Sequence, residues 1–170
     1  MRCARTSSKT FATDPRFVAV PELDAREPST SFNVRGRDLR VDLLTPGSRE
    51  SARPVLLPHL NAAALPLPGL EYLLTGATQA VVISGTGVLV NVPSPARFAV
   101  HKLWVAQRRN VSEHAKARKD IRQAGQILEV LLEDRRNDVD EAFGALTPSM
   151  VRLVRRSCAT LDDSLRKRLP

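Results

Sequence analysis

The hydrophobic period of this 170-residue chain changes near residues 93–95, and this change constrains the fold more than any other feature. Before it, apolar and polar residues alternate in short runs, which is typical of strands; after it, apolar residues recur at helical spacing. Ser94 and Pro95 form a helix start, because serine caps a first turn and proline suits the first helical position. The sequence therefore predicts an α+β fold, in which a partial mixed sheet is followed by a C-terminal helical bundle.

Three regions are expected along the chain. Residues 1–14 are basic and polar without a periodic apolar face, which predicts a disordered lead-in. Residues 15–93 are expected to form the sheet region, and residues 94–170 the helical region. The expected strands cover residues 17–20, 31–34, 37–44, 55–57, 79–83 and 88–92, and the expected helices cover residues 68–74, 95–109, 113–133 (capped by Ser112), 137–146 and 148–169.

Composition limits the classes of function. The formal net charge of +8 and the pI near 10.5 favour anionic partners, namely nucleotides, nucleic acid or an acidic protein. Aromatic residues make up only 4% of the chain, which argues against a base-stacking platform for single strands. Cys3 and Cys158 lie far apart, so neither a disulfide framework nor a zinc site is expected, and a reducing cytoplasm fits best. The sequence contains neither a signal-peptide pattern nor an apolar run long enough to span a membrane.

One acidic residue falls within a predicted strand. In residues 37–46, RDLRVDLLTP, a period of two places Asp42 on the face opposite Val41. Two interpretations stay open for this carboxylate. Asp42 either pairs with Arg37 or Arg40, or faces water, as most strand aspartates do; or it is an oxygen ligand for a Mg²⁺ ion shared with a substrate phosphate.

Other chemistries have no support in the sequence. The three histidines, His59, His101 and His114, do not fall at metal-ligand spacing, and no serine shows an activating base. The Ser-Gly-Thr-Gly run at residues 84–87 matches neither a P-loop nor a dinucleotide fingerprint. It predicts a hairpin turn between two valine-rich strands.

Four segments are more informative in combination: STSFNVRGRDLRVDLLTP, PVLLPHLNAAALPLPGLEYLL, GVLVNVPSPARFAVHKLWVAQRR and KARKDIRQAGQILEVL. Their order and spacing, over about residues 17–132, resemble a bacterial family of nucleotidyltransferase-fold proteins. This family is related to the minimal nucleotidyltransferases and to the abortive-infection toxin enzymes of type IV kind. The resemblance implies that the predicted sheet is a partial sheet of the nucleotidyltransferase type.

The resemblance also implies a reaction and its residues. Relatives transfer a nucleoside monophosphate from a nucleoside triphosphate to an acceptor, with Mg²⁺ held by three carboxylates. Asp42 matches the third of these carboxylates, and is the expected catalytic and metal-binding residue. The positions that match the family's nucleotide-binding helices are Lys102, Lys119, Asp120 and Gln123. Two ions about 4 Å apart would need the bridging charge that three carboxylates supply.

The sequence departs from the family pattern before Asp42. Relatives carry a Gly-Ser turn and an Asp-x-Asp pair there, and neither motif precedes Asp42 in this chain. One carboxylate cannot hold a hard, strongly hydrated cation with the required geometry. We therefore expect the C-terminal part of such a protein, with weak or absent transfer and an unknown acceptor. The alternative is a non-catalytic basic module that binds nucleic acid or an acidic protein through its helices.

Overall fold

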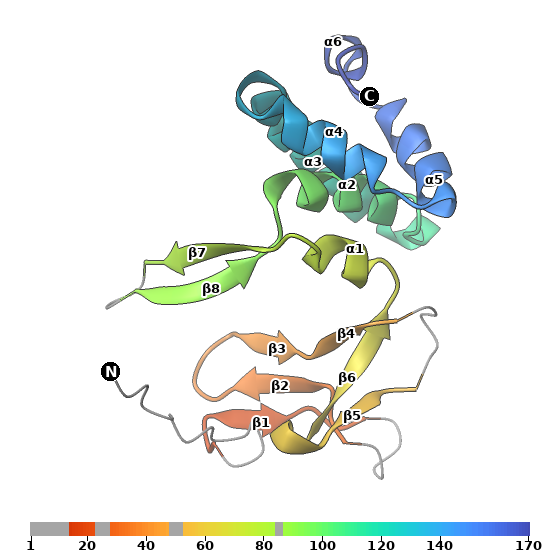
Figure 1. Cartoon of the computed structure of the whole chain (residues 1–170). Coiled ribbons are helices and arrows are strands. Elements are labelled where there is room, and N and C mark those ends of the chain that lie inside the picture. Colours follow the sequence, from red (N-terminus) through yellow and green to blue (C-terminus); the bar gives the residue numbers. More distant parts are fainter. Residues whose placement is uncertain (1–13, 23–27, 48–52, 84–86) are drawn as a thin grey trace. The chain divides into compact units, whose positions relative to one another are not determined.

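The computed structural model describes residues 14–22, 28–47, 53–83 and 87–170. The chain forms two compact units, Met1–Leu70 and Glu71–Pro170, whose elements are labelled in Figure 1. The described part of the first unit is rich in short strands, and the second contains a hairpin and the long helices. The α+β prediction is thereby confirmed. The expected division into a sheet region and a helical region at residue 94 stays a prediction, as does the lead-in, which lies outside the described residues apart from Asp14.

An antiparallel sheet with the strand order β1-β2-β3 opens the first unit. Gly36 has a φ of 72° in the turn between β2 and β3, where the lack of a side chain removes the usual steric cost. Val41 lies opposite the buried Phe32 in the register, so the alternation turns Asp42 away from the core as predicted. The strands are β1 (Phe17–Ala19), β2 (Ser31–Val34) and β3 (Arg40–Asp42).

The single strand predicted over residues 37–44 is in fact two strands that belong to two sheets. The backbone of Leu43 changes partner: its N–H donates to Thr30 O at 2.8 Å, and its carbonyl accepts from Leu65 N at 2.8 Å. The chain then enters a mixed sheet with the order β4-β6-β5, where β4 is parallel and β5 antiparallel to β6. These strands are β4 (Leu44–Pro46), β5 (Val55–Leu57, followed by a 3₁₀ turn at Pro58–Leu60) and β6 (Ala62–Leu67).

The central strand β6 is not predicted by the sequence. It contains three buried alanines, which have low strand propensity, and Pro66, a residue that usually excludes a central position. A close contact explains part of this arrangement. A Cβ placed on Gly47 would lie 2.4 Å from Pro66 Cβ, so only glycine lets the chain after β4 approach β6 this closely.

The second unit begins with a short helix and the predicted hairpin. The helix α1 (Leu70–Leu74) is tied to the later helices by Tyr72, whose hydroxyl donates to Ala142 O at 2.8 Å. The Arg97 guanidinium lies 5.0 Å from the Tyr72 ring centroid and donates to Tyr72 O at 3.2 Å. The hairpin consists of β7 (Thr78–Val82) and β8 (Val88–Val92); the turn predicted at residues 84–87 lies outside the described residues except for Gly87.

Helix α2 is the centre of the helical bundle, because α3, α4 and α5 all pack on it. Its residues Val100 and Leu103 are fully buried, as are Leu128, Val139 and Val154 on the surrounding helices. None of the helices in the described ranges is long and apolar enough to cross a membrane. The helices are α2 (Pro95–Ala106), α3 (His114–Asp134), α4 (Arg136–Gly144), α5 (Pro148–Cys158) and α6 (Asp163–Arg166).

The helix starts are predicted better than the helix ends. Ser94 Oγ accepts from Arg97 N at 3.2 Å, which confirms the predicted cap of α2. The cap predicted at Ser112 is wrong, because this residue lies in a 3₁₀ turn at Val111–Glu113 and α3 begins only at His114. The last predicted helix is also too long: it ends at Cys158, and α6 follows after a turn.

Candidate functional site

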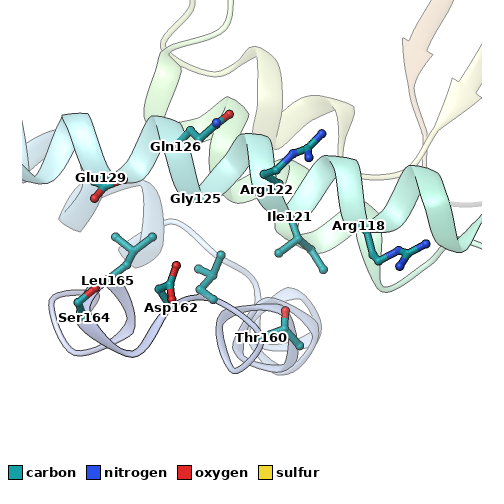
Figure 2. A pocket seen from close by; sticks show the side chains of 11 residues that line it. Arg118, Ile121, Arg122, Gly125, Gln126, Glu129, Thr160, Asp162, Ser164 and Leu165 are labelled. Atoms are coloured by element: carbon teal, nitrogen blue, oxygen red, sulfur yellow. The ribbon is translucent and has the colours of Figure 1, made fainter.

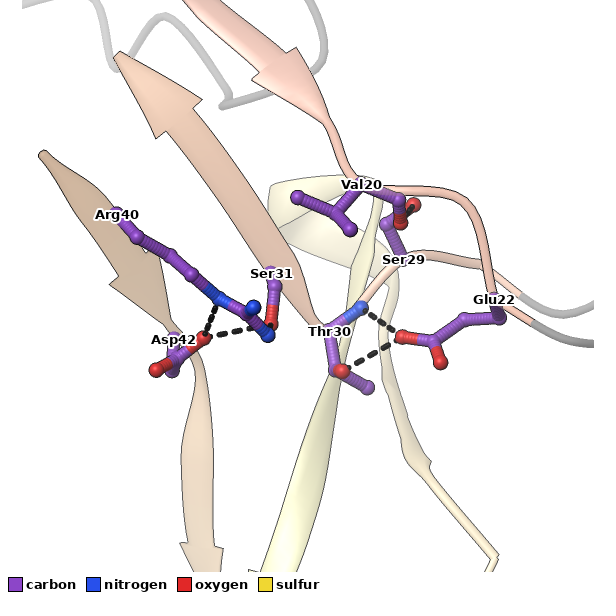
Figure 3. Close-up of polar contacts among 7 residues, drawn as sticks. All are labelled: Val20, Glu22, Ser29, Thr30, Ser31, Arg40 and Asp42. Atoms are coloured by element: carbon purple, nitrogen blue, oxygen red, sulfur yellow. Dashed lines mark hydrogen bonds and ion pairs between the residues drawn. The ribbon is translucent and has the colours of Figure 1, made fainter. Parts of the chain in front are cut away.

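Asp42 belongs to a small polar network on the first sheet. Ser31 Oγ donates to Asp42 Oδ1 at 2.6 Å, and Arg40 Nε donates to the same oxygen at 2.8 Å. Arg40 Nη2 also donates to Ser31 Oγ at 2.8 Å, which closes a triangle of three side chains (Figure 3). The hydrogen bond from Ser31, followed by that from Arg40, lowers the pKa of the Asp42 carboxyl. Arg40 is therefore the partner of Asp42, as the first interpretation of the sequence predicts.

The register of two strands brings these groups together. Ser31 lies directly opposite Asp42 across the β2–β3 pair, and Arg40 precedes Asp42 by two residues on the same strand. Side chains two residues apart on a strand project from the same face, so Arg40 and Asp42 are neighbours there. The Asp42 side chain nevertheless keeps 52% of its surface exposed, so the ion pair is screened by water and contributes little to stability.

Asp42 lines a small pocket, and Glu22 supplies a second carboxylate to it. Its Oε1 accepts from Thr30 N at 3.0 Å and from Thr30 Oγ1 at 2.7 Å, and these bonds lower the pKa of Glu22 (Figure 3). The pocket has a volume of about 400 Å³. Its polar lining comes mainly from Glu22, Thr30, Ser31, Arg40 and Asp42, and its apolar lining from Val20, Pro21, Leu43, Leu44 and Leu65.

The described oxygen atoms that line this pocket do not form a coordination site for a divalent metal ion. A hard cation needs six or more oxygen ligands, of which a nucleotidyl-transfer site takes several from carboxylates. The pocket offers two carboxylates, and Arg40 places a positive charge 2.8 Å from Asp42 Oδ1. In the described ranges no three His, Cys, Asp or Glu side chains are grouped to hold a metal. Asp24 and Glu27 lie outside these ranges, and the role of Asp42 as catalytic and metal-binding residue stays a prediction.

Two of the four residues predicted to bind nucleotide meet in the second unit. Lys102 on α2 places its Nζ 2.8 Å from Asp120 Oδ1 on α3. Arg109 contacts the other carboxylate oxygen through Nε at 2.8 Å and Nη2 at 2.7 Å. Burial opposes ionisation of Asp120, but the hydrogen bonds and charges of Lys102 and Arg109 outweigh it and lower the pKa. The Lys102–Asp120 pair therefore joins two helices and leaves less of the lysine charge for a ligand.

The other two predicted residues lie on the outer part of α3. Lys119 is exposed and Gln123 is half-buried, one turn further along the helix. Arg118, Lys119 and Arg122 together form an exposed cluster, here called the basic face of α3. Among the described residues, none of these three forms an ion pair within 4.0 Å.

The charges in the last turn of α3 oppose the helix dipole. The first half carries the basic face, while Glu129, Glu133 and Asp134 lie in the second half. A helix is stabilised by acidic residues at its start and basic residues at its end, at about 0.3–1 kcal/mol each. Glu133 and Asp134 in the last turn are therefore unfavourable for the helix alone, whereas Glu113 at the N-cap is favourable. The basic face lies beyond the first turn, so any attraction that it exerts on an anion comes from its three side-chain charges.

A pocket of about 550 Å³ lies beside the basic face, between α3 and the segment that precedes and includes α6 (Figure 2). Ile121, Leu161 and Leu165 make it partly apolar, and Arg118 and Arg122 line it, whereas Lys119 and Gln123 do not belong to its described lining. The close packing of its floor involves Gly125, where a Cβ would lie 3.2 Å from Leu161 Cδ2. The pocket therefore does not bring the four predicted nucleotide-binding residues together.

Several residues of these networks are not predicted by the sequence. Ser31 and Glu22 come close to Asp42 through strand pairing and a loop, which no local pattern reveals. The contact of Arg109 with Asp120 depends on how α2 and α3 pack, which the sequence does not reveal. His101 lies next to Lys102, and burial, with the Lys102 charge, lowers its pKa to about 4.

A family model described as nucleotidyltransferase matches residues 11–147, a span that includes Asp42 and all four helical candidates. Neither the curated proteins nor the solved structures contain a significant match.

Proposed function

The chain belongs to the nucleotidyltransferase family, and we propose that it binds a nucleoside triphosphate but transfers its nucleoside monophosphate weakly or not at all. The observation that carries this proposal is the state of Asp42. Its carboxylate is held by Ser31 and Arg40, and the described donors around it do not fit Mg²⁺. The acceptor in the family reaction stays unknown. A closer kinship with the minimal and abortive-infection nucleotidyltransferases of bacteria, and a place in the cytoplasm, belong to the same proposal.

The phosphate groups are proposed to bind on α3. Lys119 supplies an exposed ammonium, and the amide of Gln123 lies one turn away. The three positive charges of the basic face attract a triphosphate to this part of α3. Lys102 and Asp120 act as positioning residues, because their ion pair fixes α3 against α2.

A transfer assay tests the catalytic part. The purified chain is incubated with each α-³²P-labelled nucleoside triphosphate, Mg²⁺ or Mn²⁺, and total RNA or protein as acceptor. We expect incorporation that is close to that of the heat-denatured chain and that Asp42→Ala does not change. Mg²⁺-dependent incorporation that disappears in Asp42→Ala, but not in the control Asp38→Ala, would refute the proposal. Asp38 is a suitable control because it is exposed in the turn that precedes β3.

A second candidate function rests on the basic face of α3. Three exposed positive charges that form no ion pair among the described residues are suited to a polyanion. The corresponding hypothesis is a binding module for nucleic acid or an acidic protein, independent of Asp42. It is favoured over catalysis if nucleotides bind no better than inorganic triphosphate.

Salt dependence tests this second candidate. Binding of a labelled oligonucleotide is measured by fluorescence anisotropy between about 50 and 200 mM salt, where each phosphate contact adds nearly one to the slope of log K against log salt. Arg122→Ala should lower the slope by about one. Arg136→Ala is the matched control, since its guanidinium pairs with Asp140 at 3.8 Å. Affinity that does not change with salt would count against a polyanion.

A further inference from the structure

The hairpin of β7 and β8 presents apolar side chains to solvent. Val81 and Leu89 face each other across the two strands and are 61% and 60% exposed, and Ile83 is 93% exposed. The next pair, Val82 and Val88, is 50% and 54% exposed. The hairpin extends away from the helices of its unit (Figure 1), and its strands pair only with each other in the described part of the chain. A two-stranded hairpin is marginally stable by itself, so we expect this one to pack against another surface.

The absence of charged residues around the hairpin indicates what kind of surface can pack against it. Residues 72–96 contain no Asp, Glu, Lys, Arg or His, although charged residues make up 26% of the chain. Exposed strands that must stay unpaired usually carry lysine or another charge. A chain with a net charge of +8 repels its own copies over most of its surface, but a charge-free hairpin avoids this repulsion.

We propose that the β7–β8 hairpin is a self-association surface on which a second copy of this chain packs its own hairpin. A two-fold axis would place Val81, Ile83 and Leu89 against the same three residues of the other copy. Such a contact is self-complementary, because it joins apolar side chains without any like charges. It would cover the apolar pairs that the single chain leaves exposed.

The size of the hairpin predicts a weak association. Each strand has five residues, so it is about 17 Å long, and the strands lie about 5 Å apart. One face of this hairpin is therefore smaller than the roughly 800 Å² per partner of a standard stable interface. We expect a reversible dimer that forms in the micromolar range.

Sedimentation velocity over about 2 to 200 μM tests the proposal, since a small interface dissociates within this range. The average mass should rise from 18.7 kDa toward twice that value. Leu89→Lys should raise the dissociation constant at least tenfold. Val130→Lys is the matched control, because Val130 lies on α3 and is 59% exposed, nearly the same as Leu89.

Two results would overturn the proposal: a monomer mass at every concentration, or an equal loss of association in Leu89→Lys and Val130→Lys. If Leu89→Lys does not fold by circular dichroism, hydrogen exchange of the unmodified chain decides. Protection of the amides in β7 should rise with protein concentration. Protection that does not change with protein concentration would contradict packing against a second copy.

Discussion

Replacement of Asp120 by asparagine tests whether the ion-pair network between α2 and α3 holds the helical unit together. The Asp120 carboxylate accepts from Lys102 on one oxygen and from Arg109 on the other, at 2.7–2.8 Å. An asparagine side chain has one oxygen, so it can accept from only one of these cations and turns an N–H₂ group toward the other. The substitution therefore leaves one cation without its partner.

The expected cost follows from the burial of the three groups. Removing one partner of a fully buried ion pair destabilises a protein by about 3–5 kcal/mol. Here Asp120 is 8% exposed, but the side chains of Lys102 and Arg109 are 19% and 26% exposed, so water can solvate the released cations. We therefore expect the free energy of unfolding of the second unit to fall by about 2–3 kcal/mol, which is less than the cost for a fully buried pair.

Fluorescence provides a specific assay for this unit. Trp104 is the only tryptophan of the chain, and it is buried in α2, so its emission during urea unfolding reports the helical unit alone. Asp140→Asn is the control, because Asp140 is half exposed and its ion pair with Arg136 is long, at 3.8 Å. Its cost should stay below about 0.5 kcal/mol. A loss for Asp120→Asn no larger than that of the control would refute the structural role of the network.

The stability of Asp120→Asn should depend less on pH in the acid range than that of the unmodified chain. The native pKa of Asp120 is lowered, so its contribution to stability is complete above the ordinary carboxyl pKa of about 4 and is lost as the pH falls through the native value. The difference in unfolding free energy between the unmodified chain and Asp120→Asn should therefore shrink as the pH falls from about 5 to 3. A difference that stays constant over this range would show that the carboxylate charge is not the cause.

Three further predictions concern single residues. Gly47→Ala should reduce hydrogen-exchange protection in β6 by at least tenfold, because the new Cβ would lie 2.4 Å from that strand; Gly144→Ala, with no atom within 4 Å of its Cβ, should not. His101 should titrate by NMR with a pKa of about 4. The unfolding free energy should therefore fall as the pH is lowered from about 6.5 to 4, because the unfolded chain binds a proton that the buried imidazole does not; a native pKa near 6.5 would contradict its burial. Burial raises the pKa of the Cys158 thiol to about 11, so only about one thiol in a thousand is ionised at pH 8. In a variant in which Cys3 is replaced by serine, a thiol reagent should therefore label Cys158 far more slowly than it labels free cysteine.

The sequence predicts those features of the fold that depend on local patterns. Ser94 marks the start of α2 because capping is a short-range interaction, and alternation alone places Asp42 on the face opposite Val41. The strand β6 is missed because alanine and proline disfavour strands, and only the close approach of Gly47 and Pro66 makes that strand possible.

The candidate site depends more strongly on long-range contacts. Asp42 and Lys102 could be named from their motif positions, but their partners could not. Ser31 reaches Asp42 through strand register, and Asp120 reaches Lys102 through the packing of two helices, eighteen residues apart in the chain. The resemblance to nucleotidyltransferases agrees with the family match over residues 11–147.

The most direct test of the proposed function is isothermal titration of the chain with ATP, CTP, GTP and UTP, each with and without Mg²⁺. We predict binding of a nucleoside triphosphate that does not require Mg²⁺, is weakened by Lys119→Ala, and is unchanged in Asp42→Ala. Mg²⁺-dependent binding that Asp42→Ala abolishes would contradict the account, because it would show a working metal site at Asp42.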